Sequence, residues 1–158
     1  MENIKSLKPL AAAIGGTMAI ALLLLVGDAA SISLLMAPFG ASCVIAFVLP
    51  ESPLAKPRSI IGGHMISAGV GLAMLELFGT HHWSIALSVG FSILLMQWTR
   101  TVHPPAGADP LVVMLSGAGW PFLITPVLLG AIIIAGAAYV YRRLLAAKGA
   151  AVKQAERN

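Results

Sequence analysis

Charged residues are scarce in this chain of 158 residues, at only 10%, whereas 58% of the residues are hydrophobic and the mean hydropathy is +0.91. Soluble domains carry about 25% charged residues. The shortage of charge excludes a water-soluble globular fold, and the excess of apolar residues excludes a disordered chain. Cys43 is the only cysteine, which excludes an intrachain disulfide and a thiolate metal site.

The few charges leave long uncharged stretches between them. Nineteen residues separate Lys8 from Asp28, twenty-two separate Asp28 from Glu51, and thirty-two separate Asp109 from Arg142. A helix of about 20 apolar residues spans the ~30 Å hydrocarbon core of a bilayer. The sequence therefore predicts an all-α, polytopic transmembrane helical bundle whose surroundings are the lipid bilayer.

Hydropathy indicates six spanning segments within a single membrane domain that covers residues 1–158. The expected spans are residues 9–27, 31–50, 59–77, 83–99, 102–118 and 121–141, and a basic cytoplasmic tail covers residues 142–158. With six crossings, all basic loops and both termini lie on one side, and the acids Asp28 and Glu76 lie on the other. The basic residues used in this argument are Lys5, Lys8, Lys56, Arg58, Arg100, Arg142 and Arg143.

A topology with four crossings would place Lys56, Arg58 and Arg100 outside, against the positive-inside rule. We therefore expect six crossings, with the N- and C-termini in the cytoplasm. The same rule explains the net charge of +4, so no nucleic-acid partner is expected.

Two short motifs predict an internal repeat. Pro38-Phe39-Gly40-Ala41 and Pro105-Ala106-Gly107-Ala108 share the pattern Pro-x-Gly-Ala at an offset of 67 residues. Paired Pro/Gly interruptions in the two halves of a transporter indicate a midplane site built by inverted repeats. We expect two inverted repeats of three segments, the second of each being broken at the motif. A chance match of four residues is the alternative.

The stretch around His103 carries the clearest chemical signal. Pro104 disfavours a helical His103, whereas Pro105 suits the first turn of a helix. A half-helix that starts inside the membrane presents free amides and a positive dipole end, which together bind anions. The expected substrate-binding residues are His103, Pro104, Pro105, Gly107, Ala108, Pro38, Gly40, Ala41, Ser42 and Arg100. The alternative is that the prolines only kink packed helices and that His103 bonds a freed carbonyl.

Two further ionisable residues lie within the spans. His64 and Asp109 are expected to act in gating or proton coupling, because ionisable groups inside a membrane are functional by default. A packing role for His64 and a capping role for Asp109 remain alternatives, with Arg100 as the natural partner of Asp109. His81 and His82 are interpreted as interfacial, and neither a metal site nor a cofactor is expected.

Four ordered motifs resemble the HPP family of small integral membrane proteins, named for the His-Pro-Pro triplet. The motifs are residues 37–42 (APFGAS), 52–58 (SPLAKPR), 62–64 (GGH) and 99–108 (TRTVHPPAGA). The resemblance covers about residues 9–141, although the family usually has Gln where Lys56 stands. It implies a multi-pass protein of a bacterial-type inner (plasma) membrane, and plastid relatives of the family are associated with nitrite transport.

The predicted function is a membrane transporter or channel for a small inorganic anion, and the resemblance favours nitrite. An enzyme is not expected, because the chain carries no nucleophile elbow, phosphate loop, HExxH motif or paired carboxylates. A membrane scaffold or sensor subunit is one alternative, and a membrane protein with His64 and His103 as axial ligands of a cofactor is another. A homo-oligomer would suit so small a domain, with the glycine-rich face of residues 59–73 as its interface.

Overall fold

The computed structural model describes residues 2–155, and within that range the chain folds into helices and contains no strand. The helices are α1 (Glu2–Ala30), α2 (Pro38–Val48), α3 (Pro57–Phe78), α4 (His82–Trp98), α5 (Asp109–Ser116) and α6 (Leu129–Ala155). Short 3-10 turns lie at η1 (Pro53–Ala55), η2 (Pro104–Ala108) and η3 (Trp120–Leu123), and a π turn lies at η4 (Ile124–Leu128).

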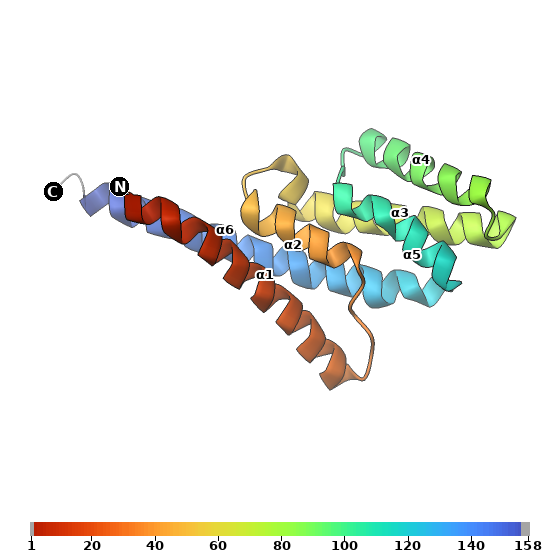
Figure 1. The fold of residues 1–158 in the computed structure, drawn as a ribbon, viewed down its shortest axis with the longest axis horizontal. Coiled ribbons are helices and arrows are strands. Elements are labelled where there is room, and N and C mark those ends of the chain that lie inside the picture. The colour runs from red at the N-terminus through yellow and green to blue at the C-terminus, as the bar shows by residue number, and fades with distance from the viewer. Residues whose placement is uncertain (1, 156–158) are drawn as a thin grey trace.

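The six helices run back and forth along the long axis of the molecule, and the two ends of the chain lie at the same end of it (Figure 1). Three helical segments are long and apolar enough to cross a membrane, namely Lys8–Ala30, Pro57–Phe78 and Trp120–Ala150. The chain is therefore a helical membrane protein, as its composition predicts. The described part of the expected basic tail continues α6 as far as Ala155, and residues 156–158 lie outside the described residues.

The helices α2 and α5 are much shorter than their neighbours, with 11 and 8 residues. Each has a proline at its first turn, and each follows a stretch without helix, at residues 33–36 before α2 and at residues 101–103 before η2 and α5. Such irregular backbone is tolerated in a membrane protein where protein buries it or water reaches it. In Figure 1, α2 runs from its N-terminal end toward the end of the molecule that holds both termini, and α5 runs the other way.

Glycines let the two halves of the chain pack closely. α3 packs against α4 and α5, while α6 packs against α1 and α2. A Cβ atom added at Gly63 would lie 2.8 Å from the Cβ of His103, and one added at Gly71 would lie 2.8 Å from the Cα of Pro110. Part of the glycine-rich face of α3 is thus occupied within the chain, whereas a Cβ atom at Gly69 on the same helix would meet open space. An interface between copies on this face stays a prediction.

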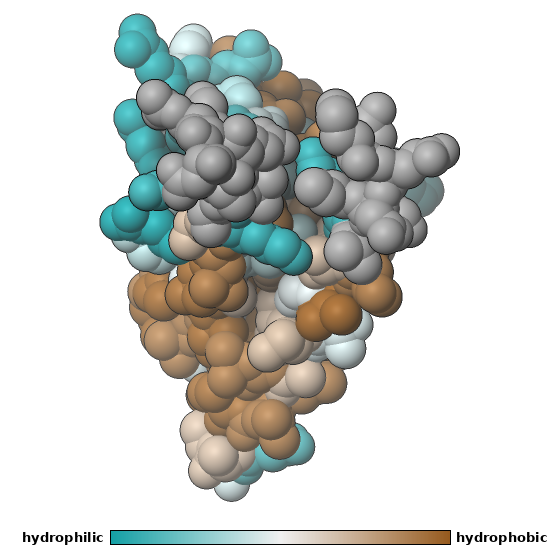
Figure 2. Space-filling model, turned by 90° about the vertical axis from the view of Figure 1, so that its left-hand side faces the viewer, coloured by the Kyte–Doolittle hydropathy of each residue, from teal (hydrophilic) through white to brown (hydrophobic). Residues whose placement is uncertain are grey.

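Large apolar side chains cover the outside of the bundle. Met18 and Leu25 on α1 are each 66% exposed, and Trp98 at the end of α4 is 72% exposed. Figure 2 looks at the end of the molecule that holds both termini, where hydrophilic residues gather in the upper part and hydrophobic residues cover the lower part. An apolar exterior of this kind matches a lipid environment, since lipid tails are as apolar as the side chains that face them.

Candidate functional site

Four polar side chains form a hydrogen-bonded cluster in the interior of the bundle. Ser42 Oγ lies 2.8 Å from His64 Nε2 and 2.8 Å from His103 Nε2. The other ring nitrogen of His64, Nδ1, lies 2.7 Å from Asp109 Oδ2. All four side chains have 0% of their surface exposed. We call Ser42, His64, His103 and Asp109 the buried cluster.

Each member of the buried cluster comes from a different element. Pro38 starts α2, so Ser42 lies one turn into that helix and faces the interior. His64 lies on α3, and Asp109 is the first residue of α5. Pro104 keeps His103 out of the helical region, and the residue is extended, with φ of −140° and ψ of 99°. The two Pro-x-Gly-Ala segments therefore meet through Ser42 and His103, which are 61 positions apart in the chain.

Two backbone carbonyls complete the cluster. His103 Nδ1 donates to the carbonyl oxygen of Leu54 over 2.8 Å, because a carbonyl can only accept. Ser42 Oγ also lies within 3.2 Å of the carbonyl oxygen of Pro38, four residues earlier in α2. Sequence reasoning missed Leu54, since the side chain carries no polar group and the contact belongs to its backbone. The only feature that could have indicated this contact is the loop before α3, which contains Leu54 and lies beside the His-Pro-Pro segment in the fold.

Asp109 pairs with His64, so the prediction that Arg100 is its partner is wrong. Asp109 does lie in the first turn of α5, where the helix dipole favours an acid, although no side chain forms an N-cap hydrogen bond there. The second carboxyl oxygen, Oδ1, is buried without a hydrogen-bond partner among the described residues. An unpartnered buried oxygen is costly, and far more so when it carries charge.

A cavity of about 460 Å³ lies beside the buried cluster, where α3 begins and α4 ends. Lys56, Arg58 and Arg100 line it, together with Leu54, whose carbonyl holds His103. Arg58 donates to the carbonyl oxygen of Thr99 over 2.6 Å, which ties the first turn of α3 to the C-terminal end of α4. We call this space the cationic cavity. Lys56 and Arg58, which the sequence offered only as markers of the cytoplasmic side, thus both lie at a cavity wall.

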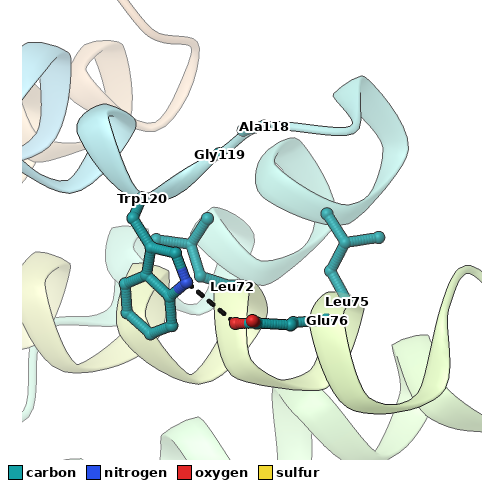
Figure 3. Close-up of a pocket in the computed structure, with 6 residues that line it drawn as sticks. All are labelled: Leu72, Leu75, Glu76, Ala118, Gly119 and Trp120. Atoms are coloured by element: carbon teal, nitrogen blue, oxygen red, sulfur yellow. Dashed lines mark hydrogen bonds between the residues drawn. The ribbon is translucent and has the colours of Figure 1, made fainter.

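A second, smaller cavity of about 230 Å³ lies toward the other end of α3 (Figure 3). Its walls are Leu72, Leu75, Ala118 and Gly119, and its polar groups are Glu76 and Trp120. The indole nitrogen of Trp120 donates to Glu76 Oε2 over 2.8 Å. The two cavities thus differ in charge, one being lined by three basic side chains and the other by one carboxylate.

The Pro-x-Gly-Ala glycines lie outside the buried cluster. Gly40 and Ala41 are exposed on the surface of the bundle, and Gly107 and Ala108 are partly buried. The amide of Gly40 donates to the carbonyl of Ala37 over 3.2 Å. A Cβ atom at Gly40 or Gly107 would meet open space. That these amides contact an anion stays a prediction. The candidate site is therefore described by the polar side chains of the buried cluster.

The histidines of the buried cluster do not fit axial ligation of a cofactor. All four ring nitrogens of His64 and His103 have hydrogen-bond partners within the chain. Their ring centroids lie 5.1 Å apart at an angle of 66°, which leaves no room for a macrocycle between them. Across the described residues, no group of three or more His, Cys, Asp or Glu side chains is placed to hold a metal ion. His81 lies exposed at the start of α4 and stacks on Trp83.

The chain matches the family described as "HPP, transmembrane region" over residues 1–150. The chain belongs to the HPP family. The His-Pro-Pro triplet of this family supplies His103 to the buried cluster. The resemblance stated from the four motifs is therefore confirmed.

Two curated relatives are both described as transmembrane proteins of Dictyostelium discoideum. One is 40% identical over 113 residues, which cover 66% of this chain and 40% of the relative. The other is 35% identical over 106 residues, which cover 62% of this chain and 34% of the relative. The matched region thus spans well under half the length of these relatives. No solved structure matches the chain.

Proposed function

We propose that this HPP protein transports a small inorganic anion across a membrane, with nitrite as the favoured substrate. The observation that carries the proposal is the cationic cavity. One residue of its lining, Leu54, accepts a hydrogen bond at its backbone carbonyl from His103 of the buried cluster. Three basic side chains concentrate anions at such a mouth. Ionisable residues deep in a membrane domain mark ion pathways, and the buried cluster supplies three of them.

The positions of the two cavities favour a carrier over an open channel. Both touch α3, the cationic cavity near Arg58 and Ser59 and the smaller one near Leu72 and Glu76. His64 lies between them on the same helix, and its side chain is fully buried. The 22 residues of α3 are about 33 Å long, which is enough to span a bilayer. The buried cluster thus separates two cavities, as alternating access requires.

The inverted repeat is part of the proposal, and close contacts at the 67-residue offset support it. Gly63 and Gly130 are such a pair, and a Cβ atom on either would meet a carbonyl oxygen at 3.1 Å. These oxygens belong to Thr101 and Leu34, which are themselves 67 positions apart. Gly69 and Gly136, also 67 apart, both face open space. Ser42 and Asp109 form a further pair at this offset, and both bond His64.

The orientation that we propose places the cationic cavity and both termini in the cytoplasm of a plasma-membrane protein. The positive-inside rule supports this orientation. Single cysteines at exposed Glu51 and Thr80, in a Cys43→Ser background, test it by labelling from outside intact cells. We expect a membrane-impermeant reagent to label position 80 only. Labelling of position 51 from outside would contradict the orientation.

Nitrite uptake into proteoliposomes tests the transport function. Liposomes with purified protein should take up nitrite faster than protein-free liposomes, which report passive leak. Nitrate, chloride and formate establish selectivity as competitors. His64→Gln should lower the rate because it breaks the pairing with Asp109, whereas Ser92→Ala should not, since Ser92 bonds only to the backbone of α4. Uptake at the protein-free rate would favour the scaffold or sensor alternative.

The geometry also resembles part of the active site of an acyl-transfer enzyme. Ser42, His64 and Asp109 are connected in the order of a Ser-His-Asp triad. Ser42 Oγ, however, is fully buried and already has three partners within hydrogen-bond distance. Neither cavity is lined by Ser42, so a substrate carbonyl has no approach to it. We therefore favour transport.

A further inference from the structure

The hydroxyl hydrogen of Ser42 has three acceptor positions within reach. They are Pro38 O at 3.2 Å, His64 Nε2 at 2.8 Å and His103 Nε2 at 2.8 Å. A serine has only one hydrogen to donate. The two ring nitrogens in contact with Ser42 are His64 Nε2 and His103 Nε2. Whichever of them does not accept this hydrogen must itself donate a hydrogen to Ser42 Oγ. The direction of one O–H bond therefore determines the protonation of both histidines.

Counting protons for each direction gives three arrangements. When Ser42 donates to His103, that ring is neutral, and His64 shares one proton with Asp109, so the cluster has no net charge. When Ser42 donates to Pro38, both Nε2 atoms donate, and His103 is an imidazolium because Leu54 already requires a proton on Nδ1. The net charge is then +1. When Ser42 donates to His64, His103 is an imidazolium and Asp109 a carboxylate.

The third arrangement is the least favourable of the three. It places full negative charge on Asp109, whose Oδ1 is buried without a hydrogen-bond partner among the described residues. A buried carboxylate needs donors on both oxygens to offset the loss of water. In the other two arrangements the proton shared with His64 keeps this pair neutral as a whole. The cluster is therefore left with a neutral state and a state that holds one more proton.

We propose that the buried cluster is a proton-binding site in which Ser42 is the switch, and that it binds one proton together with the transported anion. This inference rests on the proposed transport function. The added proton comes from water in the cationic cavity and ends on the His103 ring. The Ser42 hydrogen turns from His103 Nε2 to the Pro38 carbonyl, and His103 Nε2 then donates to Ser42 Oγ. The bond between His64 and Asp109 does not change.

The charges around His103 make proton binding depend on the anion. Lys56, Arg58 and Arg100 line the adjoining cavity, and their charges oppose an imidazolium. An anion in this cavity offsets them and adds an attraction of its own. The ring also lies against the side chains of Ser42 and His64 and the Leu54 carbonyl, and Asp109 is paired with the other nitrogen of His64. Because coupling between two binding sites is reciprocal, the proton strengthens anion binding equally.

Proton uptake by the purified protein tests this inference without requiring transport. Sodium nitrite is added to protein in a weakly buffered detergent solution near neutral pH, and a pH indicator records the protons taken up. We expect about one proton per bound nitrite for the wild type, in line with the donor count. Ser42→Ala should take up none. Ser92→Ala, which loses a similar buried backbone hydrogen bond, should behave as the wild type.

His103→Gln provides a second variant should Ser42→Ala fail to fold, and it should also take up no proton. The inference is overturned if the wild type takes up no proton, or if Ser42→Ala takes up as many as the wild type. Nitrite uptake into proteoliposomes is measured separately. Nitrite flux without proton uptake would contradict the proton site alone, whereas proton uptake without flux would contradict transport alone.

Discussion

Gly63 is the position where one added methyl group should do the most damage to the buried cluster. A Cβ atom there would lie 2.8 Å from the Cβ of His103, 3.1 Å from the carbonyl oxygen of Thr101 and 3.4 Å from the Met96 sulfur. The first two atoms are part of, or next to, the backbone, so they cannot move aside as the tip of a flexible side chain would. Gly63→Ala should therefore push His103 away from Ser42.

The expected loss of stability combines three terms. Overpacking a well-packed interior costs about 1–3 kcal/mol. Replacing a helical glycine by alanine returns about 0.5–1 kcal/mol. Leaving the buried partners of the His103–Ser42 bond unsatisfied costs about 1–3 kcal/mol. We expect a net loss of about 2–4 kcal/mol for Gly63→Ala.

Gly69→Ala is the matched control on the same helix, because a Cβ atom there meets open space. It should be neutral or stabilising by up to about 1 kcal/mol. The assay is unfolding in mixed micelles by titration with sodium dodecyl sulfate, followed by circular dichroism, with nitrite uptake measured on the same preparations. Equal stability of the two variants would refute the packing argument, and full uptake by Gly63→Ala would refute the role of the His103 position.

Three further predictions follow from the cavity, the second glycine contact and the cluster. Arg58→Gln should raise the KM for nitrite uptake about fivefold, equivalent to ~1 kcal/mol of lost attraction. It should also weaken the dependence of this KM on ionic strength. Arg143→Gln, on the far part of α6, should leave the KM and its dependence on ionic strength unchanged. Gly130→Ala should destabilise the protein, since its Cβ would overlap the ring of Phe39, whereas Gly136→Ala, with open space around its Cβ, should not. The same micelle titration measures both. His103→Gln should remove the rise of flux on acidification, because glutamine cannot take up the proton; a full pH response would disprove its role.

Most of the fold of this protein can be predicted from the hydropathy of its sequence and the positions of its charged residues. The uncharged stretches predict helices, and the prolines predict where α2 and η2 begin. The exact lengths of the short helices could not be predicted, because α2 ends at Val48 in an apolar run without a charge to mark it. Tertiary packing, which hydropathy does not record, decides such ends.

The candidate site was only partly accessible from the sequence. His64, His103, Asp109 and Ser42 could be named as residues, since each is a polar group in an apolar span. Their mutual contacts could not, because residues 22 to 61 positions apart meet through helix packing. The sequence instead suggested amide groups near Gly40 and an ion pair of Asp109 with the nearest arginine. Proximity in sequence is a poor guide to partners in a bundle of six helices.

The most direct test of transport through the buried cluster is the initial rate of nitrite uptake into proteoliposomes at increasing nitrite concentration. Wild type, His64→Gln and Ser92→Ala are compared at equal amounts of incorporated protein. We predict saturable uptake well above protein-free liposomes for the wild type and Ser92→Ala, and a strongly reduced rate for His64→Gln. Equal rates for wild-type and protein-free liposomes, or for His64→Gln and the wild type, would contradict the account.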